Sequence, residues 1–304
     1  DRGSRAALPR GSLSDWRGAV ARSRPLPSPR RRWVGDRFPR ALIPAVKNSM
    51  PDEVVRMEWD FVCFSVDVEW AHPAVLEHVT RLLDEHALSA TFFCTHAGVR
   101  VPGHERGLHP NFRFNGDTVR QLIASGVLDL DSLNESNFFE QVLEATRGFC
   151  PEAVGSRSHS LLLDCQLWSA LARQGLRYDS SYFLPGQAGL QPALLGNGIL
   201  ELPIYFMDHH DLTERVTEFR VDRLGLDRPG LKILDFHPNL VYINAVDENH
   251  YLATKTYYHE PERLSANRFL GRGIGTLFQE LLDHVADRKL PTATLGWLHE
   301  QWDR

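Results

Sequence analysis

Ionisable side chains recur at positions where a buried stretch of chain ends. Two carboxylates, three imidazoles and a guanidinium form the set: Asp67, Glu69, His109, Arg157, His159 and His237. Carboxylates combined with two or three imidazoles suit a divalent transition metal such as zinc, with one coordination position left for water. The set therefore predicts metal-assisted and acid–base chemistry, provided that the fold brings these distant positions together.

Strands that alternate with helices can gather such residues. Short apolar runs predict strands at 59–66, 89–94, 106–109, 153–157, 199–205, 231–236 and 292–295. Apolar spacing of three and four predicts helices at 72–86, 138–147, 164–174 and 275–288. This order is typical of parallel βα units, and we expect a distorted (β/α) barrel with chemistry at the carboxyl ends of its strands. No glycine-rich dinucleotide fingerprint follows the first strand.

Composition narrows the function classes. The chain is 42% hydrophobic and 24% charged, which is ordinary for a globular protein. No run of 18 apolar residues occurs, so we expect no membrane-spanning helix. Residues 1–56 hold 13 Lys+Arg and 5 Asp+Glu, which leaves 21 Lys+Arg against 34 Asp+Glu in the remainder. An acidic body argues against nucleic acid as a partner.

The first 50 residues differ from the rest. They contain six prolines and an Arg30–Arg32 run, without a sustained apolar period. Such a segment cannot bury enough surface to offset its ordering entropy, so we expect residues 1–50 to be a disordered or non-native basic tail. Residues 57–304 are expected to form the barrel. The four cysteines form no Cys-x-x-Cys pair, which favours a reducing compartment and a cytoplasmic location.

Several of these runs together resemble a known family. FSVDVE at 64–69, ATFF at 90–93 and ERGLHP at 105–110 resemble the opening motifs of the polysaccharide deacetylases, the NodB-homology domains of carbohydrate esterase family 4. GSRSH at 155–159, ELPIY at 201–205 together with Asp208, and LDFHP at 234–238 are similar to the later motifs. The branch resembles the WbmS-like deacetylases, which are associated with surface-polysaccharide gene clusters.

The resemblance implies a distorted (β/α) barrel of about seven parallel strands, a divalent metal that is commonly zinc, and removal of acetyl groups from sugars. By position, Asp67 corresponds to the catalytic base, and Arg157 to the arginine that orients it. His237 corresponds to the histidine that acts as the acid. Glu69 falls near the metal-binding carboxylate, and His109 on the first metal histidine.

Two positions depart from the family pattern. The paired aspartates of the first motif are separated here, and the second is replaced by Glu69. The second metal histidine, four positions after His109, is replaced by Arg113, which cannot bind zinc. We expect His159 to supply the missing imidazole, with His104 as the weaker candidate. The predicted metal ligands are therefore Glu69, His109 and His159.

The sequence predicts a metal-dependent deacetylase that removes N- or O-acetyl groups from a sugar or polysaccharide, in surface-polysaccharide or lipopolysaccharide biosynthesis. Two alternatives remain: a related hydrolase of a non-sugar amide, and an inactive carbohydrate-binding barrel. Asp235 is expected to face away from His237. Five aromatic residues are candidates for stacking on a sugar: Trp70, Phe112, Tyr182, Tyr205 and Tyr242.

Overall fold

A curled, mostly parallel sheet forms the centre of the fold. The structure, a computed structural model, describes residues 59–113, 116–129, 131, 134 and 137–302. Within these residues the sheet has nine strands in the order β6-β7-β5-β4-β3-β2-β1-β9-β8. The strands are β1 (Val62–Asp67), β2 (Ala90–Cys94), β3 (Glu105–Leu108), β4 (Gly155–Ser156), β5 (Tyr178–Asp179), β6 (Ala193–Leu194), β7 (Leu200–Glu201), β8 (Ile204–Met207) and β9 (Lys232–Phe236). Each neighbouring pair is parallel except β6 with β7.

The sheet curls far enough for its later strands to meet. Ile204 in β8 forms an isolated parallel β-bridge with Phe183, which follows β5. The Ile204 amide donates to the Tyr182 carbonyl at 2.7 Å, and the Leu184 amide donates to the Ile204 carbonyl at 2.9 Å. The segment after β5 thus links the middle of the sheet to its β8 edge. This arrangement confirms the expected distorted (β/α) barrel.

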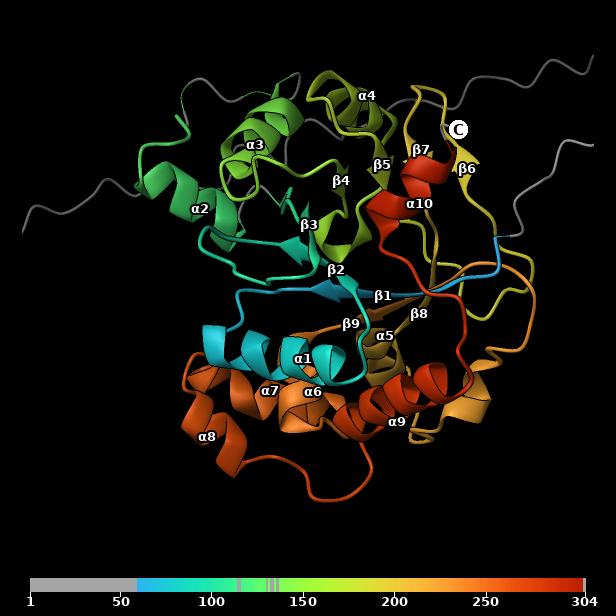
Figure 1. Cartoon of the computed structure of the whole chain (residues 1–304). Helices are drawn as coiled ribbons and strands as arrows, with labels where there is room; N and C mark the ends of the chain where they lie inside the picture. The colour runs from blue at the N-terminus through green and yellow to red at the C-terminus, as the bar shows by residue number, and fades with distance from the viewer. Residues whose placement is uncertain (1–58, 114–115, 130, 132–133, 135–136, 303–304) are drawn as a thin grey trace, which may run out of the picture. The chain divides into compact units, whose positions relative to one another are not determined.

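Ten α-helices within the described residues surround the sheet (Figure 1). They are α1 (Pro73–Glu85), α2 (Asp117–Ala124), α3 (Phe138–Arg147), α4 (Cys165–Arg173), α5 (Asp208–Thr213), α6 (Pro238–Ile243), α7 (Glu248–Thr254), α8 (Pro261–Ala266), α9 (Ile274–Asp287) and α10 (Leu295–Trp302). In Figure 1, α1 and α6 to α9 lie on one side of β1, and α2, α3, α4 and α10 lie on the other. None of these helices is long and apolar enough to cross a membrane.

Local sequence explains where the helices begin. α1 starts at Pro73, whose ring fixes a helical φ and whose missing N–H would have had no partner at that position. The His72 ring caps this end by accepting a hydrogen bond from the Ala74 amide at 3.2 Å. α4 begins after Asp164, whose carboxylate accepts from the Gln166 amide at 2.7 Å. These caps fix the loops that lead away from the strand ends.

Most predicted elements are confirmed with bounds shifted by a few residues, but the predictions of two strands were wrong. The run 199–205 divides at Pro203 into β7 and β8, which pair with different strands. Proline cannot donate to a strand ladder, and this explains the break. The run 292–295 forms an isolated bridge through Thr292, and Leu295 already begins α10. The predicted tail, residues 1–50, lies outside the described residues.

Candidate active site

The predicted site residues all lie at the carboxyl ends of strands. Asp67 ends β1, and Glu69 sits in the tight turn that follows. His109 follows β3, and Arg157 follows β4. His159 opens the short 3-10 helix η3 (His159–Leu161), and His237 caps α6 after β9. Because the strands are parallel, these ends meet at one edge of the sheet.

The turn after β1 holds a strained backbone. Glu69 has φ 48° and Trp70 has φ 56°, values that residues other than glycine adopt rarely. The Trp70 amide donates to Thr95 Oγ1 at 2.9 Å, which holds the turn against the end of β2. This geometry directs the Glu69 carboxylate toward the imidazoles of neighbouring strand ends.

Glu69, His109 and His159 form a candidate metal group. Their ligand atoms all lie within 4.8 Å of one another. Glu69 Oε1 is 3.1 Å from His109 Nε2 and 2.7 Å from His159 Nδ1. Donors at about 2.0–2.2 Å from a tetrahedral zinc ion lie roughly 3.3–3.6 Å apart. A small outward shift of these side chains would therefore accommodate the ion, and the donor set fits zinc.

A backbone carbonyl orients His109. Its Nδ1 lies 2.8 Å from the Arg157 carbonyl oxygen, a distance at which Nδ1–H donates. Nε2 then faces Glu69 and lies 3.6 Å from Asp67 Oδ2. Metal-binding histidines commonly use the other ring nitrogen in this way. Burial lowers the pKa of His109, but the nearby charges of Asp67 and Glu69 outweigh it and raise the pKa.

Glu69 is stabilised in its ionised form. Burial opposes its charge, yet hydrogen bonds from His109 and His159 hold its pKa well below the usual value. A divalent cation needs this ionised carboxylate, and on binding it would displace the protons through which the two imidazoles contact Glu69.

Arg157 joins Asp67 to a second carboxylate. Its guanidinium is fully buried, and Nη1 donates to Asp67 Oδ1 at 3.0 Å and also to Asp235. The remaining donors reach the Ser180 carbonyl and hydroxyl at 2.8 Å each. Burial raises the pKa of Asp67, but His109, Arg157 and His237 together bring it below its usual value. Asp67 is thus held as a carboxylate, and its hydrogen bond with Arg157 fixes its orientation.

The expectation that Asp235 faces away from His237 was wrong. Residues two positions apart on a strand project from the same side, and both reach the site. One ligand atom each of Asp67, Asp235 and His237 lies within 4.8 Å of the others. Burial raises the pKa of Asp235 to about 8, despite the opposing charge of Arg157.

His237 has a partner that the sequence reasoning did not assign. Asp208, the first residue of α5, accepts from the His237 amide at 2.8 Å and lies 2.7 Å from its Nδ1. Burial lowers the pKa of His237, but Asp208, Asp235 and Asp67 outweigh it and raise the pKa to about 10. The ring is therefore held protonated. The signal for Asp208 was its place just past a predicted strand end.

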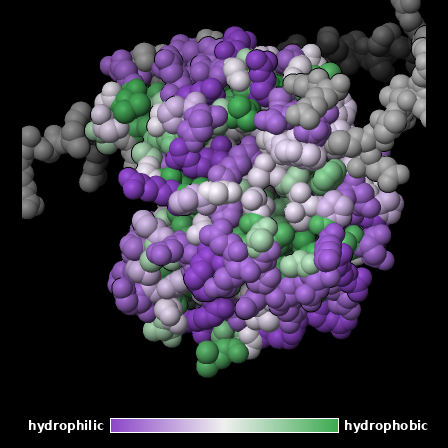
Figure 2. Space-filling model, viewed as in Figure 1, coloured by the Kyte–Doolittle hydropathy of each residue, from purple (hydrophilic) through white to green (hydrophobic). Residues whose placement is uncertain are grey.

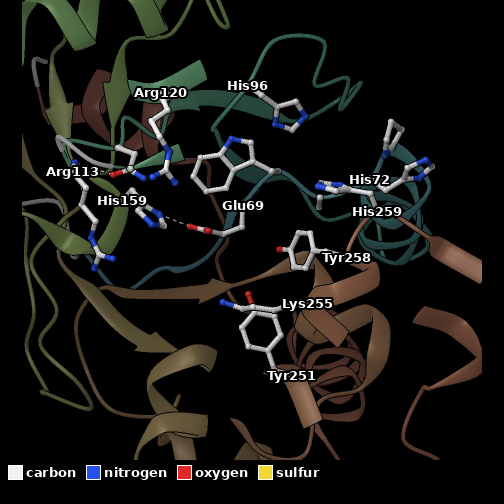
Figure 3. A pocket seen from close by; sticks show the side chains of 15 residues that line it. Glu69, His72, His96, Arg113, Arg120, His159, Tyr251, Lys255, Tyr258 and His259 are labelled. Atoms are coloured by element: carbon white, nitrogen blue, oxygen red, sulfur yellow. Dashed lines mark hydrogen bonds and ion pairs between the residues drawn. The ribbon is translucent and has the colours of Figure 1, made fainter. Parts of the chain in front are cut away.

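A cavity of about 960 Å³ opens beside Glu69 and His159. Figure 3 shows these two side chains facing each other, with the Tyr258 hydroxyl pointing toward Glu69 from the opposite wall. Trp70 lines this cavity, but Phe112, Tyr182, Tyr205 and Tyr242 are not among its lining residues. Arg113 also lines it, so this position contributes to the cavity wall.

His104 does not join the metal group. Its Nδ1 accepts from the Ala90 amide at 3.3 Å, and its ring packs against Phe92. Ala90 begins β2, so His104 lies at the amino end of the strands, away from the site.

Comparisons with known proteins identify a family and a related structure. The family described as WbmS-like polysaccharide deacetylase matches residues 64–255. A crystal structure from Bordetella bronchiseptica, assigned to a polysaccharide deacetylase involved in O-antigen biosynthesis, is 26% identical with a TM-score of 0.62. The alignment covers 75% of this chain and 91% of that one.

Two further structures are more distant. One is assigned to a polysaccharide deacetylase of Mycobacterium smegmatis, with 18% identity, a TM-score of 0.38, and coverage of 84% of this chain and 98% of that chain. The peptidoglycan deacetylase PdaC of Bacillus subtilis is 13% identical with a TM-score of 0.40 and coverage of 79% and 90%. A search of curated proteins found no match.

Proposed function

The chain belongs to the WbmS-like polysaccharide deacetylases, a family of hydrolases that act on carbon–nitrogen bonds, and we propose that it removes acetyl groups from an amino sugar with a divalent metal ion. The observation that carries the proposal is the convergence of Glu69, His109 and His159 beside the paired groups Asp67 and His237. When bound, zinc would act as a Lewis acid that polarises the acetyl carbonyl and eases deprotonation of water.

Asp67 is the proposed general base. It takes a proton from a water molecule whose oxygen attacks the acetyl carbon. Arg157 keeps this carboxylate ionised through the hydrogen bond at 3.0 Å. Because Arg157 is fully buried and bonded on several sides, it fixes the direction of Asp67 as well as its charge.

His237 is the proposed general acid. When the carbon–nitrogen bond breaks, the amine must take up a proton, and the protonated ring can supply it. Asp208 holds the ring through Nδ1, which leaves Nε2 for the leaving group. The acetyl group departs as acetate, and the amine remains on the sugar. A protonated His237 matters more for an amide than for an ester, so we propose N-acetyl groups as the main target.

We also propose a role in surface-polysaccharide biosynthesis. The support is the relative from Bordetella bronchiseptica, which is assigned to O-antigen biosynthesis. A cytoplasmic location is part of the same proposal. It is supported by the four cysteines, which are all free.

The first prediction tests metal dependence together with the base. Full-length protein should release acetate from an N-acetylated amino sugar, lose this activity after chelation, and regain it with Zn²⁺. Asp67→Asn should lower turnover by about 10²–10⁴, the usual cost of losing a general base, while metal content per chain stays unchanged. Glu69→Gln should lower the metal content itself, measured by atomic emission.

Asp287→Asn is the matched control, since Asp287 is exposed on α9. It should behave as the wild type does. Undiminished acetate release by Asp67→Asn, or full activity in protein shown to be free of metal, would contradict the proposal.

A further inference from the structure

The cavity beside the candidate metal group has an unusual charge. Three cationic side chains line it: Arg113, Arg120 and Lys255. Among the described residues that line it, Glu69 is the sole carboxylate. Its Oε1 is within hydrogen-bond distance of His109 and His159. A bound divalent cation would make the cavity more positive still.

The charge of the cavity is opposite in sign to the net charge of the chain beyond residue 56. Beyond residue 56 the chain carries 21 Lys+Arg against 34 Asp+Glu, yet the balance is reversed in the cavity. Elsewhere on the surface, arginines commonly have acidic partners, as in Arg106 with Glu152 and Arg272 with Glu280. Within the described part of the chain, neither Arg113 nor Lys255 has a carboxylate within salt-bridge distance. No acidic side chain of those described residues therefore neutralises the charge of Arg113 or Lys255.

The cations are contributed by separate walls. Arg113 lies beyond β3, Arg120 extends from α2, and Lys255 begins η5 (Lys255–Tyr257). Figure 3 shows Arg113 and Arg120 on the side of His159, and Lys255 reaching in from the opposite wall. The Lys255 ammonium lies 4.8 Å from the centre of the Tyr251 ring, which holds the flexible side chain in place.

The cavity is also large enough for more than an acetyl group. Small-molecule pockets measure about 300–1,000 Å³, and this one lies near the upper end at about 960 Å³. Its lining includes Glu69 and His159, so a molecule that fills it meets the candidate metal group. A sugar whose acetyl group lies at the metal would place its other substituents toward the cationic walls.

We propose that the substrate is an acetylated amino sugar that bears an anionic group, which Arg113 and Lys255 recognise. A carboxylate on the sugar ring and the phosphate of a nucleotide carrier both present the paired oxygens that a guanidinium binds. The inference rests on the proposed deacetylase function and names the substrate class of the same site. It also gives the residue at position 113, where the family's second metal histidine is absent, a role in substrate binding.

The second prediction tests this class with full-length, Zn²⁺-loaded protein. Acetate release is compared for three N-acetylhexosamine probes: a neutral methyl glycoside, the same glycoside oxidised to the 6-carboxylate, and the uridine diphosphate sugar. We expect kcat/KM for one anionic probe to exceed that for the neutral probe by about 10- to 100-fold, as charge-assisted hydrogen bonds contribute. The better anionic probe identifies the source of the charge.

Variants separate charge recognition from a structural role. Arg113→Gln and Lys255→Gln should each remove most of the preference for the anionic probe, because they lower its kcat/KM far more than that of the neutral probe. Arg81→Gln is the matched control, since Arg81 is exposed on α1, pairs with Glu85 and does not line the cavity. It should keep the full preference.

Binding provides a readout that does not depend on turnover. Dissociation constants are measured by calorimetry for the same probes with the Asp67→Asn protein, alone and combined with Arg113→Gln. Preferential anion binding that is lost with Arg113→Gln supports the inference, even if no probe releases acetate, a result that would contradict only the proposed function. Equal binding and equal kcat/KM for neutral and anionic probes would overturn the inference and leave the deacetylase intact. Equal losses on all probes in the variants would also overturn it.

Discussion

The buried guanidinium of Arg157 connects two carboxylates of the site that lie far apart in the sequence. It bonds Asp67 on β1 and Asp235 on β9, and Ser65 Oγ accepts from it at 2.9 Å. Removing one member of a buried ion pair leaves an uncompensated charge and costs about 3–5 kcal/mol. Substitution of Arg157 would therefore mix a loss of stability with a loss of function. The pair formed by His237 and Asp208 offers a cleaner test.

The third prediction concerns Asp208→Asn. Because the Asp208 carboxylate raises the pKa of His237, its loss should lower that pKa. The rate requires protonated His237, so it falls as pH rises through this pKa, and the basic limb of the pH–rate profile should move to lower pH. Turnover at the optimum should fall by about 10- to 100-fold, as when an orienting partner is removed.

Asp211→Asn is the control for this change. Asp211 lies on the same helix, is also buried, and pairs with Arg223 instead of His237. Its pH–rate profile should keep the wild-type shape. A profile that does not move in Asp208→Asn would assign Asp208 a purely structural role.

The site residues at strand ends could be predicted from the sequence, because parallel strands bring their carboxyl ends to one edge of the sheet. His159 was expected to replace the missing metal histidine, and its Nδ1 lies 2.7 Å from Glu69 Oε1. Asp208 was recognised as part of a motif but not as the partner of His237, since this contact spans 29 positions and depends on how β8 lies beside β9. Tyr258 was missed because it lies in the turn after η5, far along the chain, and its place opposite Glu69 depends on tertiary packing.

The short strand β4 depends on a glycine for its close approach to β5. A Cβ atom on Gly155 would lie 1.9 Å from the ring of Tyr178. This side chain is fully buried, and its hydroxyl donates to Glu105 Oε1 at 2.7 Å. Gly155 lies two positions before Arg157 on the same segment. The absence of a side chain therefore lets β4 approach β5 and carry Arg157 into the site.

The fourth prediction is that Gly155→Ala lowers the free energy of unfolding by about 1–3 kcal/mol, the usual cost of overpacking a core. Urea unfolding measures the change. In Gly148→Ala, the new methyl group would meet nothing nearer than the Ala145 carbonyl oxygen at 3.8 Å, so stability should be kept. Equal stability of Gly155→Ala and the wild type would show that β4 and β5 separate easily.

Local sequence patterns predict where some helices and strands lie, but not how the strands pair. Helix 138–147 was predicted with the bounds of α3, because its apolar positions recur with helical spacing. The division of 199–205 at Pro203 had a local signal in the proline, whereas the pairing of β7 with β5 and of β8 with β9 had none. Strand pairing depends on contacts between distant segments, which periodicity within one segment cannot reveal.

For the whole molecule, a continuous core joins the two sides of the sheet. Its buried apolar residues run from Val62 on β1 to Leu298 on α10. Figure 2 shows that the surface over this core is mostly hydrophilic on the face in view, with apolar residues in scattered groups. A core of this extent can fold cooperatively without help from a segment that has no sustained apolar period.

The fifth prediction is that a chain beginning at Met57 folds and keeps the activity of the full chain. Because residues 1–50 combine six prolines with a strongly basic composition, we expect that ordering them would cost more free energy than their burial returns. Urea unfolding and acetate release should match those of the 304-residue chain. A chain beginning at Val68 is the control; it lacks β1, whose six residues are all buried, and it should not fold. If the chain from Met57 loses cooperative unfolding, the first 56 residues contribute an integral element, because every other contact of the core is retained in it.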